Sequence, residues 1–185
     1  MTRLALAPEL RPARTHAGAA LAALESASDA AGRAIEPVLA DLLRGRVAER
    51  LGVVPPGGST SAVTEREQAC CDFADQFVVY VPGITEAHRD AVAAQLGQDL
   101  LLELTRALYV FDMTDRLRLS LGRLVDSRLC DPESGDGDDL AAVEQQPLGT
   151  AVGGLHAAAM QLHALDPVTT ELVRLHCARY HDCKT

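Results

Sequence analysis

Apolar side chains recur every three to four residues along most of this chain, which is the spacing of one face of an α-helix. A first segment with this pattern covers residues 17–34. A second begins at Pro37, because proline is tolerated in the first turn of a helix. Its apolar face consists of Leu39, Leu42, Leu43 and Val47. The stretch GVVPPGGSTS at residues 52–61 predicts a loop after this helix.

Three further helices are expected between this loop and residue 125. Thr64 with Glu67 three residues later predicts a capping box, in which the two side chains satisfy backbone N–H groups at a helix start. Aromatic residues follow at helical spacing, and we interpret them as core residues: Phe73, Phe77 and Tyr80. Thr85 begins a short helix that ends at Gly97. A long helix then covers residues 99–125, with Leu101, Leu104, Leu108 and Phe111 directed inward.

The stretch DPESGDGDD, residues 131–139, is acidic, contains two glycines and has no large apolar side chain. It predicts a linker over residues 128–147. Helical patterning returns after the linker, over residues 148–185. Asp166 followed by Pro167 is typical of a helix start, with a capping carboxylate and then proline at the first helical position. This last helix is expected to continue to Tyr180.

Composition supports an all-α fold. Alanine and leucine dominate, aromatic residues make up only 3% of the chain, and tryptophan is absent. Alanine and leucine lose little side-chain freedom in a helix, which favours helical structure. With 185 residues, the chain can bury a sizeable core in one domain or slightly more.

The net charge of −9 narrows the possible partners and location. Nucleic acid requires a basic stripe, and an anionic membrane surface attracts basic segments, so neither partner is expected. Arginines followed by AGAALAALESASDAA resemble a secretion signal, but Glu25 interrupts the apolar stretch and an amphipathic helix is the better interpretation. No run approaches the eighteen or so apolar residues of a membrane span. A cytoplasmic protein is therefore expected.

Candidate chemistry is sparse outside the last helix. The cysteines are irregularly spaced and odd in number, so neither a disulfide framework nor a zinc site is expected: Cys70, Cys71, Cys130, Cys177 and Cys183. Four histidines are spaced as polar helix residues rather than as metal ligands: His156, His163, His176 and His181. Asp112 and Asp115 either line a pocket or belong to a solvated face, and the charge pattern favours the solvated face. No cofactor or metal is expected.

Two helix starts share a sequence pattern 130 positions apart. EPVLADLLRGRVAERLGVVPP begins at Glu36, and DPVTTELVRLHCARYHDCKT begins at Asp166. The two align without a gap, which places prolines, valines, leucines, arginines and acidic residues opposite one another. The alignment predicts an internal duplication, and chance similarity between two amphipathic helices is the alternative.

The segment ELVRLHCARYHDC, residues 171–183, resembles the motif helix of the carboxymuconolactone decarboxylase and alkylhydroperoxidase D-like family. Residues 64–124 resemble the downstream half of such a unit in helix lengths and turns. The resemblance implies an all-helical bundle of about seven or eight helices that assembles into homo-oligomers. It also implies a first unit at residues 1–127, the linker at 128–147, and the start of a second unit at 148–185.

Peroxidase members of this family carry a glutamate, a Cys-x-x-Cys pair and a histidine, and a dithiol partner reduces them. The resemblance places Glu171 at the glutamate position and Cys183 at the first cysteine, whereas the second cysteine would follow Thr185. In the first unit, Asp41 takes the glutamate position, and the remaining positions hold no cysteine or histidine: Val53, Pro56 and Thr60. The second unit is therefore expected to be truncated within its motif.

Three functions remain open at this point. The first is peroxide reduction of the peroxiredoxin type, with Cys183 and Glu171 as catalytic residues and little or no turnover in the chain as given. The second is a non-catalytic helical module for oligomerisation or partner binding. The third is acid–base chemistry on a small acid, as in the decarboxylase members. As a structural alternative, Glu171 is a solvent-facing acid in the first turn of its helix, and Cys177 is a small core residue.

Overall fold

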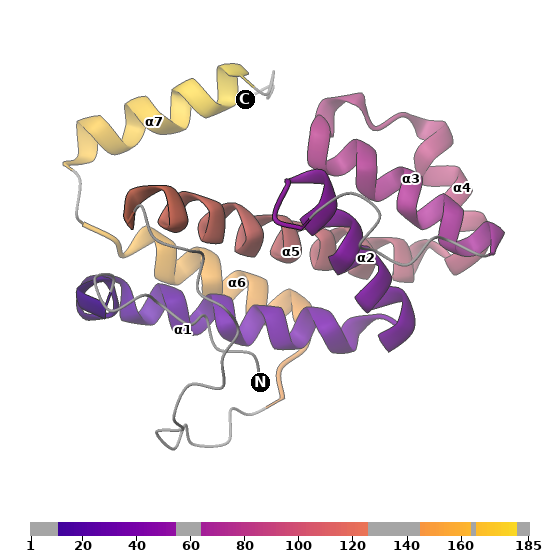
Figure 1. The fold of residues 1–185 in the computed structure, drawn as a ribbon, viewed down its shortest axis with the longest axis horizontal. Coiled ribbons are helices and arrows are strands. Elements are labelled where there is room, and N and C mark those ends of the chain that lie inside the picture. Colours follow the sequence, from indigo (N-terminus) through magenta and orange to yellow (C-terminus); the bar gives the residue numbers. More distant parts are fainter. Residues whose placement is uncertain (1–10, 55–63, 126–144, 164–165, 181–185) are drawn as a thin grey trace.

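The computed structural model describes residues 11–54, 64–125, 145–163 and 166–180. Within these ranges the chain forms seven α-helices and one short 3-10 helix, with no β-strand, which confirms the all-α expectation (Figure 1). The elements are α1 (Arg11–Ala34), α2 (Pro37–Arg50), α3 (Glu65–Val79), η2 (Val81–Gly83), α4 (Glu86–Leu96), α5 (Gln98–Val125), α6 (Leu148–Met160) and α7 (Pro167–Tyr180).

The predicted helix starts are confirmed in atomic detail. Thr64 Oγ1 accepts from the Glu67 backbone N–H at 3.1 Å, and Glu67 Oε2 accepts from the Thr64 N–H at 2.9 Å, which is the expected capping box. Asp166 Oδ1 accepts from the backbone N–H groups of Val168 and Thr169, both at 3.0 Å. Gly97 ends α4 with a φ of 84°, a left-handed conformation that glycine adopts without steric cost.

The long helix α5 forms the centre of the bundle. It packs against α1, α2, α3, α4 and α6, while α1 packs most extensively against α6 (Figure 1). The largest fully buried side chains come from α2, α3, α4 and α5: Leu43, Val47, Cys70, Val92, Leu104, Leu108 and Val110. The aromatic stripe of α3 is only partly in the core, because Phe73 is buried whereas Tyr80 is exposed.

Small side chains line the contact between α1 and its neighbours. Ala27, Ala30 and Ala31 of α1 are buried, as is Ala151 of α6. The separation of packed helices depends on the side chains between them, so alanines allow close approach. Since α6 follows the predicted linker and packs against α1 and α5, the predicted second unit contributes a helix to the core of the first. The predicted division into two units stays a prediction, and residues 126–144 lie outside the described ranges.

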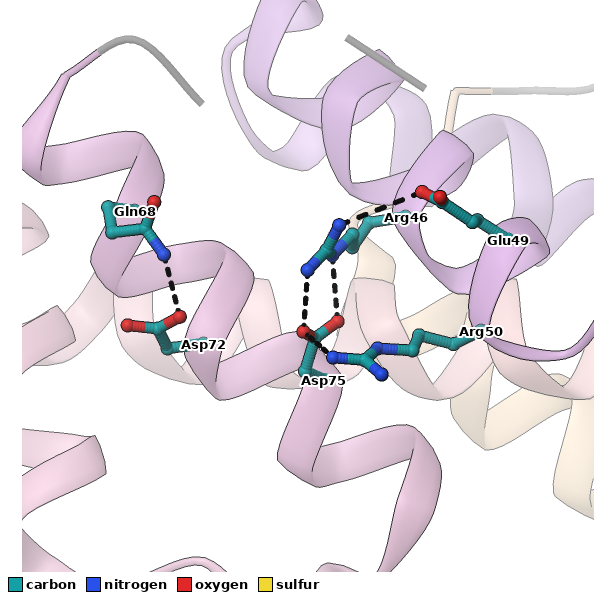
Figure 2. A network of polar contacts seen from close by, with 6 residues as sticks. All are labelled: Arg46, Glu49, Arg50, Gln68, Asp72 and Asp75. Atoms are coloured by element: carbon teal, nitrogen blue, oxygen red, sulfur yellow. Dashed lines mark hydrogen bonds and ion pairs between the residues drawn. The ribbon is translucent and has the colours of Figure 1, made fainter. Parts of the chain in front are cut away.

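A set of ion pairs joins α2 to α3 (Figure 2). Asp75 of α3 accepts two hydrogen bonds from Arg46, at Nε and Nη2, both 2.8 Å long, and a further one from Arg50. Arg46 also pairs with Glu49 at 3.6 Å. These arginines hold the pKa of Asp75 below its ordinary value, against the opposing effect of its partial burial. One turn earlier, Asp72 accepts a hydrogen bond from Gln68 of its own helix at 2.7 Å.

Candidate functional site

The two catalytic residues implied by the resemblance fall on or beyond α7. Glu171 is exposed on α7, and Cys183 lies outside the described residues, so the pair stays a prediction. The aligned helices α2 and α7 are both 14 residues long and both begin at the proline. Their surroundings differ, since Leu42 of α2 is 6% exposed and the aligned Leu172 of α7 is 61% exposed.

Helix α7 lies apart from the bundle. No other described helix approaches it within 8 Å between Cα atoms, and Figure 1 shows it as a separate yellow helix next to the bundle. Val168, Leu172 and Leu175 follow the i, i+4, i+7 spacing of one helix face, and each is more than half exposed. We call these three residues the α7 stripe. An apolar stripe on a surface helix ordinarily packs against another surface.

An open apolar groove lies on the α3, α4 and α5 side of the bundle. Its volume is about 540 Å³, and its lining includes Phe73 and Phe77 of α3 together with Leu101 and Leu102 of α5. Leu102 is half exposed although it is a large apolar residue. Arg89 of α4 is the one charged side chain among the lining residues that the structure describes. The groove is thus an apolar surface with a positive charge beside it.

The two described thiols are poorly suited to nucleophilic chemistry. Cys70 and Cys71 are free and buried in α3. Burial raises the pKa of Cys70 to about 11, and burial also raises the pKa of Cys71, partly opposed by Arg46. A thiolate is the reactive form of cysteine, so both residues are almost wholly unreactive thiols near neutral pH. Peroxide reduction, if it occurs, therefore depends on other cysteines.

A polar pocket of about 90 Å³ lies among α1, α2 and α5. We call it the Asp115 pocket. Its lining consists of Glu25, Ser28 and Asp29 of α1, Arg44 of α2, and Phe111, Thr114, Asp115 and Arg118 of α5. Glu25, Thr114 and Asp115 are buried, although polar residues are mostly exposed in folded proteins. This is the one concentration of buried polar side chains in the described core.

Asp115 is the most enclosed carboxyl group of this pocket, at 3% exposure. Its Oδ1 accepts from Arg118 Nη1 at 3.1 Å, but its Oδ2 has no hydrogen-bond partner among the described residues. Burial raises the pKa of Asp115, and the nearby guanidiniums of Arg118 and Arg44 oppose this rise. A buried carboxylate oxygen without a donor is costly, so it marks a place where a donor is missing.

The neighbouring hydroxyl groups and Arg44 are held in place. Thr114 donates its hydroxyl hydrogen to the Val110 carbonyl at 2.8 Å. Because that hydrogen is used, Ser28 must donate to Thr114 Oγ1, at 3.1 Å, across the α1–α5 contact. Arg44 lies over the Phe111 ring, 4.7 Å from its centre, a cation–π arrangement. The pocket walls are therefore largely preorganised.

The charge pattern of the sequence predicts a solvated position for Asp115, and the structure differs. Asp112 is partly exposed and accepts two hydrogen bonds from Arg116, whereas Asp115 is buried and lines the pocket. The preference for a solvated face is therefore wrong for Asp115. The α1 residues that line the same pocket are more than eighty positions away from Asp115, and helical periodicity alone does not show that they lie together.

In the part of the chain that the structure describes, the histidines do not form a second site. His156 of α6 is exposed and lies 3.0 Å from the Tyr109 hydroxyl, with the two rings edge to face. His163 and His176 are exposed as well. Within the described ranges, no group of three or more histidine, cysteine, aspartate or glutamate residues could hold a metal ion. Nor does any described helix combine the length and apolar character that crossing a membrane requires.

Comparison with known proteins gives relatives without assigned activity. The chain is similar to two uncharacterized proteins of Mycobacterium tuberculosis, MT2376 of strain CDC 1551 / Oshkosh and Rv2313c of strain ATCC 25618 / H37Rv. Each match has 34% identity over 124 residues, which is 64% of this chain and 41% of the relative. The chain thus spans about two fifths of the length of these curated relatives. No family model matches. No solved structure matches either.

Proposed function

We propose that this chain is a non-catalytic helical module of the cytoplasm that self-associates by placing α7 in the apolar groove of a second copy. The separation of α7 from the bundle, with the α7 stripe exposed, is the observation that carries this proposal. An isolated helix of about 12–15 residues is only marginally stable in water. The 14-residue α7 therefore needs a packing partner to remain helical.

The groove suits the α7 stripe in apolar character and in charge. Its apolar walls, including Phe77 and Leu102, offer a surface on which Leu172 and its neighbours lose contact with water. Glu171 follows the edge of the stripe on α7, and Arg89 lies beside the groove, so opposite charges would meet at the margin. Each copy of the chain carries both the α7 stripe and the groove. The α7 stripe of one copy can therefore pack in the groove of a second copy.

Sedimentation velocity over a range of protein concentrations tests this proposal. The wild-type chain is expected to dimerise reversibly, and Leu172→Lys is expected to remain monomeric, since it places a charge in the stripe. Leu102→Lys in the groove is expected to have the same effect. Both residues are exposed, so the bundle should fold in either variant.

Thr170→Lys is the matched control, because Thr170 is exposed on the opposite side of α7 from Leu172. It is expected to associate as the wild type does. A wild-type chain that is monomeric at every concentration would contradict the proposal, and that result would also be expected if α7 folds onto its own bundle. Dimerisation of Leu172→Lys with wild-type affinity would contradict it as well.

Peroxide reduction stays a second prediction, which rests on the family resemblance of residues 171–183. It requires Cys183, with Glu171 as a proton carrier and a dithiol partner as reductant. Consumption of hydrogen peroxide in the presence of a dithiol, compared between the wild type and Cys183→Ser, is the direct test. Equal rates in the two chains would remove this function.

A further inference from the structure

The Asp115 pocket combines a cavity with a buried carboxylate oxygen that has no hydrogen-bond donor among the described residues. Asp115 Oδ2 is buried and without a partner among the described residues, and its side chain lines the cavity. A volume of about 90 Å³ corresponds to roughly three water molecules at about 30 Å³ each. It also corresponds to a ligand of only a few non-hydrogen atoms.

The buried carboxylate of Asp115 favours a cation. Asp29 and Asp115 are among the lining residues with a carboxyl group, and Arg44 and Arg118 supply two guanidinium groups. One of those guanidiniums, that of Arg44, is also shared with Asp41 outside the pocket, at 3.4 Å. A donor that carries a positive charge would therefore interact more strongly with Asp115 Oδ2 than a neutral donor.

The chemistry of the walls favours a nitrogen cation over a metal ion. Within the described ranges, no group of three or more carboxylate, histidine or cysteine ligands could hold a metal ion. The positive charges of the guanidinium groups of Arg44 and Arg118 in the lining would also repel a metal ion. An ammonium group carries three N–H donors and is small enough for the cavity. It can donate to Asp115 Oδ2, while the Ser28 hydroxyl oxygen retains lone pairs that accept a second hydrogen bond.

We propose that the Asp115 pocket binds the ammonium group of a small primary amine, whose nitrogen donates to Asp115 Oδ2. Arg44 and Arg118 are partly exposed, with about two fifths of each side chain accessible, so they border the entrance. A compound that also carries a carboxylate could pair with them there. The pocket shares no lining residue with the groove, and α7 takes no part in it, so this inference is independent of self-association.

The test is a titration of the full chain at pH 7.5 with methylammonium chloride, followed by two-dimensional amide NMR. The expected result is saturable shifts confined to residues 25–29, 44 and 111–118. An affinity on the order of a few millimolar is expected, because a ligand with two non-hydrogen atoms has a low ceiling of binding energy. Potassium chloride at equal concentration supplies the same charge without donors and is expected to leave those amides unshifted.

Asp115→Asn keeps the size of the side chain and removes the charged acceptor, so it is expected to weaken methylammonium binding at least tenfold. Asp112→Asn is the matched control, because Asp112 lies one turn earlier on α5 and does not line the pocket. It is expected to bind within twofold of the wild type. Asp29→Asn, at a partly exposed lining residue, tests the charge argument without altering a buried group, and a weakening of severalfold is expected.

The proposal is overturned if methylammonium produces no saturable shifts at these amides, or if potassium produces the same shifts. Unchanged affinity in both Asp115→Asn and Asp29→Asn would overturn it as well. Should Asp115→Asn fail to fold, which far-UV circular dichroism would show, the comparison of Asp29→Asn with Asp112→Asn decides the outcome.

Discussion

The carboxylate of Asp75 connects α2 to α3 through both Arg46 and Arg50, and its removal should reduce the stability of the bundle. Hydrogen bonds to charged groups contribute about 1.5–3 kcal/mol each when shielded from water. Here the side chains of Arg46 and Arg50 are 33% and 44% exposed, so water screens and partly replaces the lost contacts. We therefore expect Asp75→Asn to lower the free energy of unfolding by about 2 kcal/mol in total.

Urea unfolding at pH 7, followed by circular dichroism at 222 nm, measures this difference. For a chain of this size, a loss of about 2 kcal/mol corresponds to a fall in Tm of about 4–8 °C. Asp72→Asn is the control on the same helix, because Asp72 contacts only Gln68 of its own helix among the described residues. It should change the free energy by no more than about 0.5 kcal/mol. If the two variants lose equal stability, the connection between α2 and α3 does not contribute as argued.

The contribution of Asp75 should also depend on pH in a defined direction. Because the pKa of Asp75 is lowered in the folded chain, its stabilising contribution is complete above the ordinary value of 3.8. It is lost as the pH falls through the lower pKa of the folded state. The difference between the wild type and Asp75→Asn should therefore stay constant from pH 7 to about 5 and shrink below about 4. A difference that grows on acidification would refute the assignment.

Three further variants or reactions test the core, a thiol and a helix cap. Leu43→Ala removes a fully buried side chain and should cost about 3 kcal/mol in urea unfolding; a cost below about 1 kcal/mol would contradict its core position. Cys70, with its pKa raised to about 11, should react with iodoacetamide at pH 8 far more slowly in the folded chain than in urea, as measured by peptide mass spectrometry, and equal rates would contradict its burial. Thr64→Ala should cost about 1 kcal/mol through loss of the capping box, whereas Thr64→Ser should cost much less.

Helix boundaries were the most predictable part of this fold. The starts at Pro37, Thr64 and Asp166, and the end at Gly97, follow from the local chemistry of caps and turns, and the structure confirms each within a residue or two. Local hydrogen bonds decide such positions, so the neighbouring sequence contains the information. The aromatic stripe was less predictable, because helical spacing gives a shared face but does not show where the core ends along it.

The Asp115 pocket could not be predicted, because it depends on contacts between distant segments. Asp112 and Asp115 have the same residue type on the same helix, yet one pairs with Arg116 at the surface and the other is buried against α1. The separation of α7 was likewise not evident from its pattern, since the same apolar spacing packs into the core in α2. Burial is decided by which helices meet, and that information is not local.

The pairing of α1 with α6 has a consequence for how the protein emerges from the ribosome. The two helices lie side by side, yet Ala34 and Leu148 are 114 positions apart in the sequence (Figure 1). At about 5–20 residues per second, roughly 6–23 seconds of synthesis pass between them. During this interval the surface of α1 that packs against α6 has no final neighbour, and a chaperone or the partly built bundle would shield it from aggregation.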